Sequence, residues 1–378
     1  MKKSKITIII LILLVPLLFF LITKLVDSKK PEVTEAPQAT ATATVQATEI
    51  PQAQEVVNVF NWEDYIDPAA LKLFTEETGI KVNYMNFTTN EDMMVQVRTS
   101  EGAFDIVFPS DYCVERLLAE DLLLPIAPEK VPYVSGLMDW LKNPSYDANN
   151  AHSIPYMWGT VGVLYDTTRV QGDVNSWSVV FSEDNKGEVF MLDSVRDSMG
   201  VALKYLGYGM NTRDPMELKA ATDLLIAQKE AGIVKAYQVD ETKDKMVAGE
   251  GVVAVMWSGD AQYAINLNEN LAYSIPEEGS NVWVDAMVIP RSAQNVDNAL
   301  TFINFMCRPD IAQMNVEYIS YSTPIQEVVD TLGEEYQNNV AQNPSQEDID
   351  RCEFFHDIHD FLEVYNTLWA QVKNAKAQ

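Results

Sequence analysis

Short apolar runs and amphipathic segments alternate along the chain from residue 56 onward. The runs are rich in β-branched and aromatic residues, and polar loops or helical patterns separate them. The first predicted elements are, in order, the strand 56–61, the helix 69–77, the strand 80–87, the helix 93–98 and the strand 104–108. This β-α-β-α-β order predicts a doubly wound α/β sheet.

Two longer apolar segments predict strands that cross between two parts of the molecule. Ser153 to Tyr165 reads as a strand that leaves a first lobe for a second, and Trp283 to Ile289 as a strand that returns. The other predicted elements are the strands 187–193, 234–237 and 252–257, the helices 201–206, 215–231 and 298–306, and an amphipathic helical end at 346–373.

The start of the returning strand brings an indole and a carboxylate to one face. In Val282-Trp283-Val284-Asp285, residues two apart share a side of an extended backbone, so Trp283 and Asp285 point together while the valines point into the protein. The pair suits an organic cation, because methylenes lie on the aromatic face and the carboxylate binds the ammonium. The alternative is a core tryptophan beside an exposed aspartate.

Polar loops with an aromatic residue beside a carboxylate follow two predicted strands. Asn61-Trp62-Glu63-Asp64-Tyr65 follows the first, and Pro109-Ser110-Asp111-Tyr112 follows the third. The carboxyl ends of sheet strands are where open α/β folds hold ligands. A third loop carries Asp193, Ser194 and Asp197 before a helix, where serine and aspartate also act as caps, and we expect at least one of the three to do so.

Composition and charge limit the kinds of partner that the protein can bind. The 378 residues are 47% hydrophobic, as in a globular protein of about two domains, and 55 acidic against 27 basic residues give a formal charge of -28. This balance argues against nucleic acid or an anionic lipid surface as partner and suits a cationic ligand.

The N-terminus indicates the compartment. Three lysines precede the apolar run Ile6 to Ile22, which predicts an uncleaved signal anchor over residues 1–27, with a cleaved signal peptide as the alternative. Residues 28–55 are rich in Pro, Ala, Thr, Gln and Glu and predict a disordered tether. We therefore expect the folded part outside the cytoplasmic membrane, tethered to its outer face.

The cysteines and histidines form no recognisable metal or disulfide framework. Three cysteines allow one disulfide, for which Cys307 with Cys352 is the pairing to test. His356-x-x-His359 is the one histidine spacing that could bind a metal, and a solvated helix face is the simpler interpretation.

No catalytic signature is present in the sequence. There is no Gly-x-Ser-x-Gly elbow, no phosphate-binding glycine loop and no histidine beside a plausible nucleophile. Paired carboxylates could serve a glycosidase, but here the acidic residues lie on separate loops, each with an aromatic neighbour. This arrangement favours enclosing a ligand, and we interpret the chain as a binding protein.

Six motifs, in order, resemble the extracytoplasmic spermidine/putrescine-binding proteins of polyamine ABC transporters. They are Asn61–Tyr65, Thr75–Val82, Pro109–Tyr112, Ser153–Gly159, Met256–Gly259 and Trp283–Asp285. The resemblance runs from about Val56 to the end of the chain. It implies an α/β periplasmic-binding-protein fold with two lobes, crossing hinge segments and a ligand cleft between the lobes. The lobes would be 56–158 with 283–328, and 159–282 with 329–378.

The resemblance also implies a set of ligand-binding residues. The aromatic residues that match the family's ligand walls are Trp62, Tyr65, Tyr112, Trp257, Trp283 and Tyr321. The polar residues are Glu63, Asp64, Ser110, Asp193, Asp197 and Asp285. Ser194 falls where the spermidine binder has an aspartate, so Asp193 or a water would replace that contact. Phe355 falls where the family has a polar amide.

The function implied is capture of spermidine or putrescine by lobe closure and delivery to the membrane permease. We expect a monomer with no cofactor, metal or catalytic residue. The alternatives are a binder of thiamine or ferric iron, the latter through Tyr318 and Tyr321, an extracellular hydrolase, and a surface adhesin that reuses the fold. The choice between spermidine and putrescine depends on what the second ammonium meets near Ser194.

Overall fold

The computed structural model describes residues 54–376 except 171 and 173. These described residues form one compact unit. The predicted anchor and nearly all of the predicted tether lie outside the described residues. None of the helices within the described part has the length and apolar character that a membrane crossing needs.

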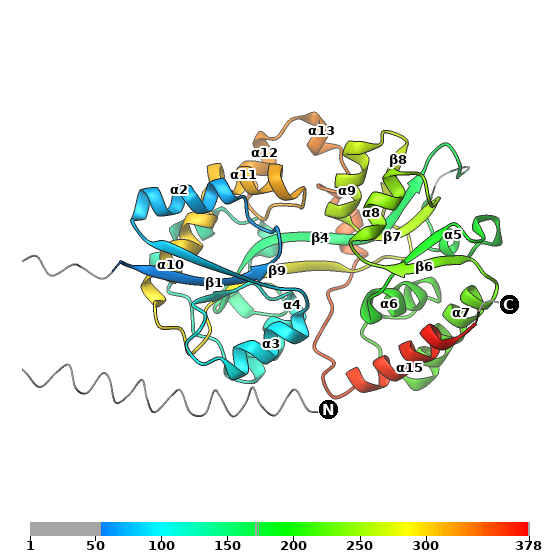
Figure 1. The fold of residues 1–378 in the computed structure, drawn as a ribbon, viewed down its shortest axis with the longest axis horizontal. Coiled ribbons are helices and arrows are strands. Elements are labelled where there is room, and N and C mark those ends of the chain that lie inside the picture. Colours follow the sequence, from blue (N-terminus) through cyan, green and yellow to red (C-terminus); the bar gives the residue numbers. More distant parts are fainter. Residues whose placement is uncertain (1–53, 171, 173, 377–378) are drawn as a thin grey trace, which may run out of the picture. The chain divides into compact units, whose positions relative to one another are not determined.

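In the described residues, nine strands form one sheet. Along the sheet the order is β2-β1-β3-β9-β4-β7-β5-β6, and β8 pairs with β4 beside this path (Figure 1). The strands are β1 Val56–Trp62, β2 Lys81–Phe87, β3 Ile106–Val107, β4 Ser153–Asp166, β5 Val189–Leu192, β6 Val234–Gln238, β7 Val253–Trp257, β8 Leu271–Ser274 and β9 Val282–Val288.

Helices cover both halves of the sheet. They are α2 Pro68–Thr78, α3 Asn90–Thr99, α4 Asp111–Ala119, α5 Ser178–Phe181, α6 Val195–Tyr205, α7 Pro215–Glu230, α8 Glu241–Val247, α9 Ser258–Leu267, α10 Val296–Met306, α11 Pro309–Ile319, α12 Gln326–Thr331, α13 Glu334–Gln337, α14 Gln346–Asp350 and α15 Leu362–Asn374. We call lobe 1 the part built around β1, β2 and β3, and lobe 2 the part built around β5, β6, β7 and β8.

The start of lobe 1 confirms the predicted β-α-β-α-β order. Strand β1 pairs in parallel with β2 and β3. Helix α2 begins where the Asp67 side chain accepts a bond from the Ala69 amide, and it ends at Gly79, whose φ of 75° glycine adopts without the steric cost that a Cβ atom brings. The loops after β1 and β3 therefore lie at the same edge of the sheet.

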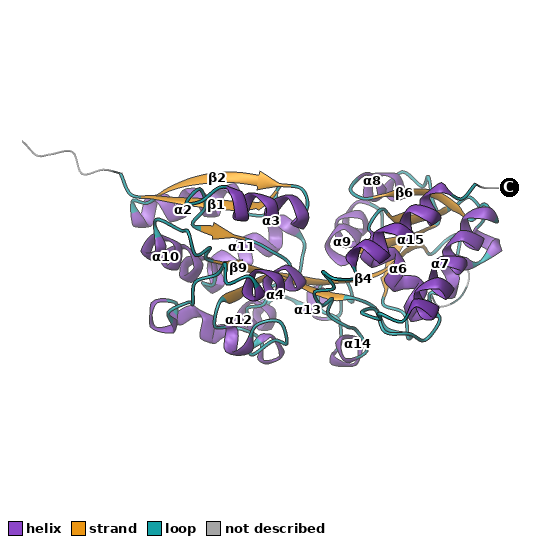
Figure 2. Ribbon diagram, turned by 90° about the horizontal axis from the view of Figure 1, so that it is seen from below, coloured by secondary structure: helices purple, strands orange, loops and turns teal. Residues whose placement is uncertain are grey.

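Strands β4 and β9 are the crossing segments that the apolar pattern predicts. The first half of the 14-residue β4 pairs antiparallel with β9, and its second half pairs with β7 and β8 of lobe 2. Figures 1 and 2 show this pair running from one lobe into the other. The pairing shifts between Pro155 and Met157, where proline has no amide hydrogen to donate to the ladder.

Each lobe has its own apolar core. In lobe 1, Phe74 packs edge-on against Phe302 and Phe305 of α10. In lobe 2, Trp177 and Tyr365 are buried against α6 and α7. Burying a large apolar side chain contributes about 1.5–3 kcal/mol. Residues of the crossing strands belong to both cores, for example Ile154 of β4 in lobe 1 and Val163 of β4 in lobe 2, so the strands are anchored in each lobe.

The predicted lobe boundaries remain a prediction, and the core contacts indicate where the last crossing lies. Val329 and Tyr336 pack in the lobe 1 core, whereas Ala341 packs in a lobe 2 cluster with Met256. The chain thus continues in lobe 1 beyond residue 329 before it turns to lobe 2.

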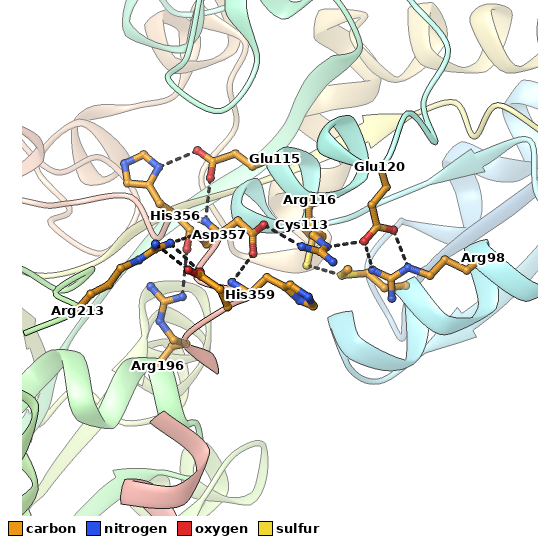
Figure 3. A network of polar contacts seen from close by, with 12 residues as sticks. Arg98, Cys113, Glu115, Arg116, Glu120, Arg196, Arg213, His356, Asp357 and His359 are labelled. Atoms are coloured by element: carbon orange, nitrogen blue, oxygen red, sulfur yellow. Dashed lines mark hydrogen bonds and ion pairs between the residues drawn. The ribbon is translucent and has the colours of Figure 1, made fainter. Parts of the chain in front are cut away.

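The prediction of one helix over 346–373 is wrong. Helices α14 and α15 are separated by a loop over 351–361, which contains His356 and His359, so these histidines do not share a helix face. The loop's backbone is bound by distant side chains: Arg196 donates to the His356 carbonyl at 3.2 Å, and Glu115 of α4 accepts from the Asp357 amide at 2.8 Å (Figure 3). These contacts replace the internal bonds of a helix.

The expected cysteine pair is also wrong. All three cysteines lie in the described part and all are free. Cys307 is buried in the lobe 1 core, while Cys352 donates to the Asp348 carbonyl oxygen at 3.1 Å. The two sulfur atoms pack in different parts of the protein, so no disulfide forms between them.

Candidate ligand-binding site

Asp285 of β9 is a buried carboxylate held by two hydroxyl groups. Tyr65 donates to its Oδ2 at 2.8 Å and Ser110 donates to its Oδ1 at 2.6 Å. The residue is 6% exposed, and this burial raises the pKa of Asp285 to about 6 although both hydroxyl bonds lower it. Within the described residues, no lysine or arginine forms an ion pair with it. Asp285 is thus a buried carboxylate that could bind a cation.

Ser110 is fixed from two sides. It pairs with Asp285 as an isolated antiparallel bridge at the N-terminus of α4. Asn90, at the start of α3, donates one amide hydrogen to Ser110 Oγ and another to the Tyr112 hydroxyl, both at 3.0 Å. The asparagine therefore joins two predicted site residues, Ser110 and Tyr112.

Tyr65 is oriented by its neighbours. Its carbonyl oxygen accepts a bond from the Tyr156 hydroxyl at 2.7 Å, and its ring lies edge-on to Tyr156 and to Tyr321. The loop after β1 thus presents the Tyr65 hydroxyl to Asp285.

Trp283 and Tyr321 form an aromatic corner beside Asp285. Their ring centroids are 5.1 Å apart at 75°, and Tyr321 also lies 6.0 Å from Tyr65. Val282 and Val284 are buried as predicted and Trp283 is half-buried, but Asp285 is buried as well. The Trp283 Nε1 is buried and has no hydrogen-bond partner among the described residues.

Gly159 of β4 makes room for Trp283. A Cβ atom at position 159 would lie 2.6 Å from Trp283 Cζ2 and 2.6 Å from Ser258 Oγ. Both contacts are shorter than real Cβ atoms make. Glycine is therefore required here by the close approach of the indole.

We predict that Gly159→Ala destabilises the protein by about 1–3 kcal/mol, because it overpacks the Trp283 contact. Urea unfolding with tryptophan fluorescence would measure the loss. Gly333→Ala is the matched control, since nothing lies within 4 Å of its Cβ position and its φ of -66° suits alanine. Equal unfolding midpoints for the two variants would contradict the prediction.

Asp197 is the corresponding carboxylate of lobe 2. Ser194 caps α6 by accepting from the Asp197 amide at 3.4 Å, and its hydroxyl donates to Asp197 Oδ2 at 2.5 Å. Burial raises the pKa of Asp197 to about 6, against hydrogen bonds from Ser194 and the Trp257 side chain. The capping interpretation of this loop is confirmed, and α6 begins at Val195, earlier than the expected residue 201.

Other predicted residues have different surroundings. Asp193 is exposed and forms an ion pair with Lys373 at 2.7 Å, so its carboxylate is already neutralised. Glu63 and Asp64 are exposed in the loop after β1. Trp62 is half-buried, donates from Nε1 to the Phe108 carbonyl at 3.0 Å and packs on Phe87.

Phe355 is buried beneath a guanidinium group. The Arg196 Cζ lies 4.2 Å from the Phe355 ring centroid, and Arg196 donates to Asn211 Oδ1 at 2.7 Å. Phe355 thus places an apolar ring against Arg196 of lobe 2. The resemblance implies a polar amide at this position.

Three residues that sequence reasoning passed over support the site. Asn90 and Tyr156 donate hydrogen bonds to Ser110 and Tyr65, which contact Asp285, and Asp260 lies in the first turn of α9, against which the Tyr321 ring packs at Gly259. Asp260 comes shortly after the end of strand β7, and the other candidate residues also lie in loops that follow strands. This position in the sequence could have identified Asp260 as a candidate. Tyr156 lies within the motif Ser153–Gly159, whereas nothing in the local sequence marks Asn90.

One cavity of the described residues lies away from this site. A cavity of about 500 Å³ in lobe 1 is lined by residues between Ile126 and Ile154 and includes none of the predicted residues. No group of three histidine, cysteine, aspartate or glutamate side chains within the described part is arranged to hold a metal ion.

The two-lobed sheet, with the buried carboxylate of Asp285 on a crossing strand and that of Asp197 in lobe 2, is the architecture of a solute-binding protein. The chain belongs to the bacterial extracellular solute-binding proteins, whose family model matches residues 69–344.

Its relatives include transport proteins of named specificity. The chain is 34% identical over 317 residues to the spermidine/putrescine-binding periplasmic protein of Escherichia coli, covering 83% of this chain and 90% of the relative. The structure resembles PotD, the spermidine/putrescine ABC transporter substrate-binding protein of Streptococcus pneumoniae, with TM-score 0.78, 36% identity and coverage of 84% and 98%. It also resembles a putative spermidine/putrescine ABC transporter protein of Listeria monocytogenes, with TM-score 0.79, 37% identity and coverage of 85% and 99%.

Proposed function

We propose that this chain is the polyamine-binding component of an ABC importer, which captures spermidine or putrescine outside the cytoplasmic membrane and delivers it to the permease. The observation that carries the proposal is Asp285, a buried carboxylate held by Tyr65 and Ser110 beside the rings of Trp283 and Tyr321. The named specificities of the relatives support the same ligand class.

A polyamine would supply the positive charge that no lysine or arginine of the described residues brings to Asp285. An ammonium group would donate to Asp285 and compensate for the loss of water around the carboxylate. Methylenes would lie against the aromatic faces of Trp283 and Tyr321. Asp197, beside Trp257 in lobe 2, is the candidate for a second ammonium, with Ser194 as the support of Asp197. The remaining proposed contacts are Trp62, Glu63, Asp64 and Tyr112.

Binding would favour a closed arrangement of the lobes. Asp285 belongs to a crossing strand with its partners in lobe 1, and Asp197 belongs to lobe 2. A ligand that contacts both gains more in the closed state than in the open one, and this difference shifts the population. The permease would recognise the closed state.

The partners and location follow from the same proposal. The family is extracellular, and residues 1–27 with the tether would hold the folded unit at the outer face of the membrane. The protein would act as a monomer without catalysis. Asp193, paired with Lys373, is left out of the proposed site.

The alternatives have less support from the side chains. Ferric iron would use tyrosinate ligands, but Tyr318 is 48% exposed, whereas the Tyr321 ring packs against Trp283 and Tyr65. Thiamine shares the positive charge and is therefore a useful competitor in the test. Red colour on adding iron, or turnover of a polyamine conjugate, would favour the iron binder or the hydrolase.

A thermal-shift panel on the unit 53–378 tests the proposed function. Putrescine, spermidine and spermine should each be compared with thiamine and ferric citrate. A ligand present at 100 times its Kd adds about 2.7 kcal/mol of stability to the folded state. We expect a polyamine to raise the melting temperature most. The proposal fails if no polyamine shifts it while thiamine or iron does.

A further inference from the structure

The chain after β3 stays beside β9 as far as the start of α4. The Ala286 amide donates to the Pro109 carbonyl oxygen at 2.9 Å, and Ser110 pairs with Asp285 as an isolated antiparallel bridge. At Asp111 the backbone turns into α4, and the Ser110 carbonyl oxygen accepts from amides of this helix instead of from β9. The backbone ladder between the two segments therefore ends here.

The side chain of Asp111 continues this ladder. Its Oδ2 accepts from the Val284 amide of β9 at 3.1 Å, and its Oδ1 accepts from the Tyr112 amide at 2.6 Å. Asp111 is 1% exposed and Val284 is fully buried, so water cannot replace the carboxylate as the acceptor for this amide. A buried carboxylate thus serves β9 where a backbone carbonyl oxygen would otherwise be required.

Asp285 lies between the two amides that are held in this way. The preceding amide, of Val284, is bound to Asp111, and the following amide, of Ala286, is bound to the chain before α4. The backbone of Asp285 therefore cannot shift relative to the start of α4 without breaking one of these bonds. This arrangement holds the Asp285 carboxylate where the Ser110 hydroxyl donates to it at 2.6 Å.

We infer that Asp111 is a positioning residue for ligand binding, which fixes β9 so that the Asp285 carboxylate faces Ser110 and an arriving ammonium group. This inference rests on the proposed polyamine site, and it assigns Asp111 no contact with the ligand. Both carboxylate oxygens of Asp111 are instead engaged by backbone amides of the protein. Because the Asp285 carboxylate is held in place before a ligand arrives, less ordering is needed on binding.

A double-mutant cycle in spermidine binding tests this role. In Asp111→Ser the shorter side chain cannot reach the Val284 amide, so β9 loses this bond. We expect calorimetry to show binding weakened about five- to twentyfold, because a displaced Asp285 carboxylate loses part of a charged hydrogen bond. In the Asp285→Asn background the same change should weaken binding less than about twofold, because the carboxylate that Asp111 positions is absent. An equal loss in both backgrounds overturns the inference, since Asp111 would then act on the ligand through its own charge.

Asp111→Asn is a second variant, for use if the serine variant does not fold. A carboxamide has one acceptor oxygen, so only one of the two amide bonds at position 111 can remain with full strength. We expect binding about three- to tenfold weaker than that of the wild-type chain, and again a change of less than about twofold in the Asp285→Asn background. No loss at all, or the same loss in both backgrounds, overturns the inference.

Asp105→Asn is the matched control. Asp105 is also a fully buried carboxylate that accepts from backbone amides, those of Gln294 at 3.0 Å and Asn295 at 2.8 Å. It precedes β3, whereas Asp111 follows it, so the two carboxylates lie at opposite ends of this strand. We expect Asp105→Asn to lower the melting temperature but to change the spermidine affinity less than about twofold. A loss of affinity equal to that of Asp111→Ser would mean that any buried carboxylate has this effect and would overturn the inference.

Hydrogen exchange without ligand separates this inference from the proposed function. Asp111→Ser should speed the exchange of amides in β9 more than Asp105→Asn does, because only the first variant frees the Val284 amide. Unaltered exchange in Asp111→Ser overturns the positioning role even if spermidine binds. If exchange changes as expected and no polyamine binds the wild-type chain, the proposed function is what fails.

Discussion

Replacing Asp285 with asparagine is expected to weaken polyamine binding by about 1–3 kcal/mol, the contribution of a charged hydrogen bond or more. The amide keeps the shape of the side chain, so Tyr65 and Ser110 stay close to position 285, but it removes the charge that an ammonium would meet. Isothermal calorimetry with spermidine measures the change. Unchanged affinity would refute the assignment of Asp285.

The same variant should not lose stability in the absence of ligand. The folded-state pKa of Asp285, about 6, is above the ordinary value of 3.8, so folding disfavours its ionised form. The free energy of unfolding of the ligand-free protein therefore increases as the pH falls from about 6 towards about 4. At pH 8 the charged carboxylate destabilises the folded state, and asparagine removes this destabilisation. We expect an equal or higher melting temperature at pH 8.

Asp193→Asn is the control for this experiment. It removes a carboxylate that is exposed and paired with Lys373, so neither polyamine affinity nor ligand-free stability should change by more than about 0.5 kcal/mol. If Asp193→Asn lowered the affinity as much as Asp285→Asn, the loss would reflect net charge and not a contact.

Polyamine binding is expected to weaken steeply below pH 6. Burial raises the pKa of Asp197 and of Asp285 to about 6 in the free protein, and an ammonium bound to either carboxylate would lower that pKa. Binding therefore releases protons at acidic pH. The affinity should be constant above about pH 7 and fall below pH 6, by up to about tenfold per pH unit for each carboxylate. Polyamine nitrogens stay protonated across this range, because amine pKa values resemble that of lysine, about 10.4.

Calorimetry from pH 5 to pH 8 in buffers of different ionisation enthalpy measures both the affinity and the protons released. Asp285→Asn should reduce the slope of log Kd against pH by about one, since one titrating group is removed. An affinity that stays constant down to pH 5 would contradict the proposal that both carboxylates bind ammonium groups.

The sequence predicted the fold where the pattern of apolar residues was long enough to leave one solution. Ser153 to Tyr165 is nearly continuous in apolar residues, which suits a strand buried on both faces, and β4 is that strand. The pattern failed at 346–373, where apolar residues recur through the loop 351–361. That loop depends on Arg196 and Glu115, which are far away in sequence, so local periodicity could not reveal it.

The candidate site was predicted to the extent that it depends on strand geometry. The alternation around Trp283 and Asp285 required only that β9 be extended. Asp193 shows the limit of this reasoning, since its ion pair with Lys373 joins two residues that are far apart in the sequence. The packing of the Tyr321 ring on Gly259 likewise depends on how α9 meets the crossing segments, and only the folded chain brings these residues together.

The free thiols have a consequence for life outside the cell. Burial raises the pKa of Cys307 to about 12 and of Cys352 to about 11, and it raises the pKa of Cys113 well above its usual range. Only the thiolate attacks disulfides or reacts readily with peroxide, so these sulfurs are nearly inert at neutral pH. A solute-binding protein built this way needs no oxidative folding machinery, and it resists covalent cross-linking to its neighbours in an oxidising environment.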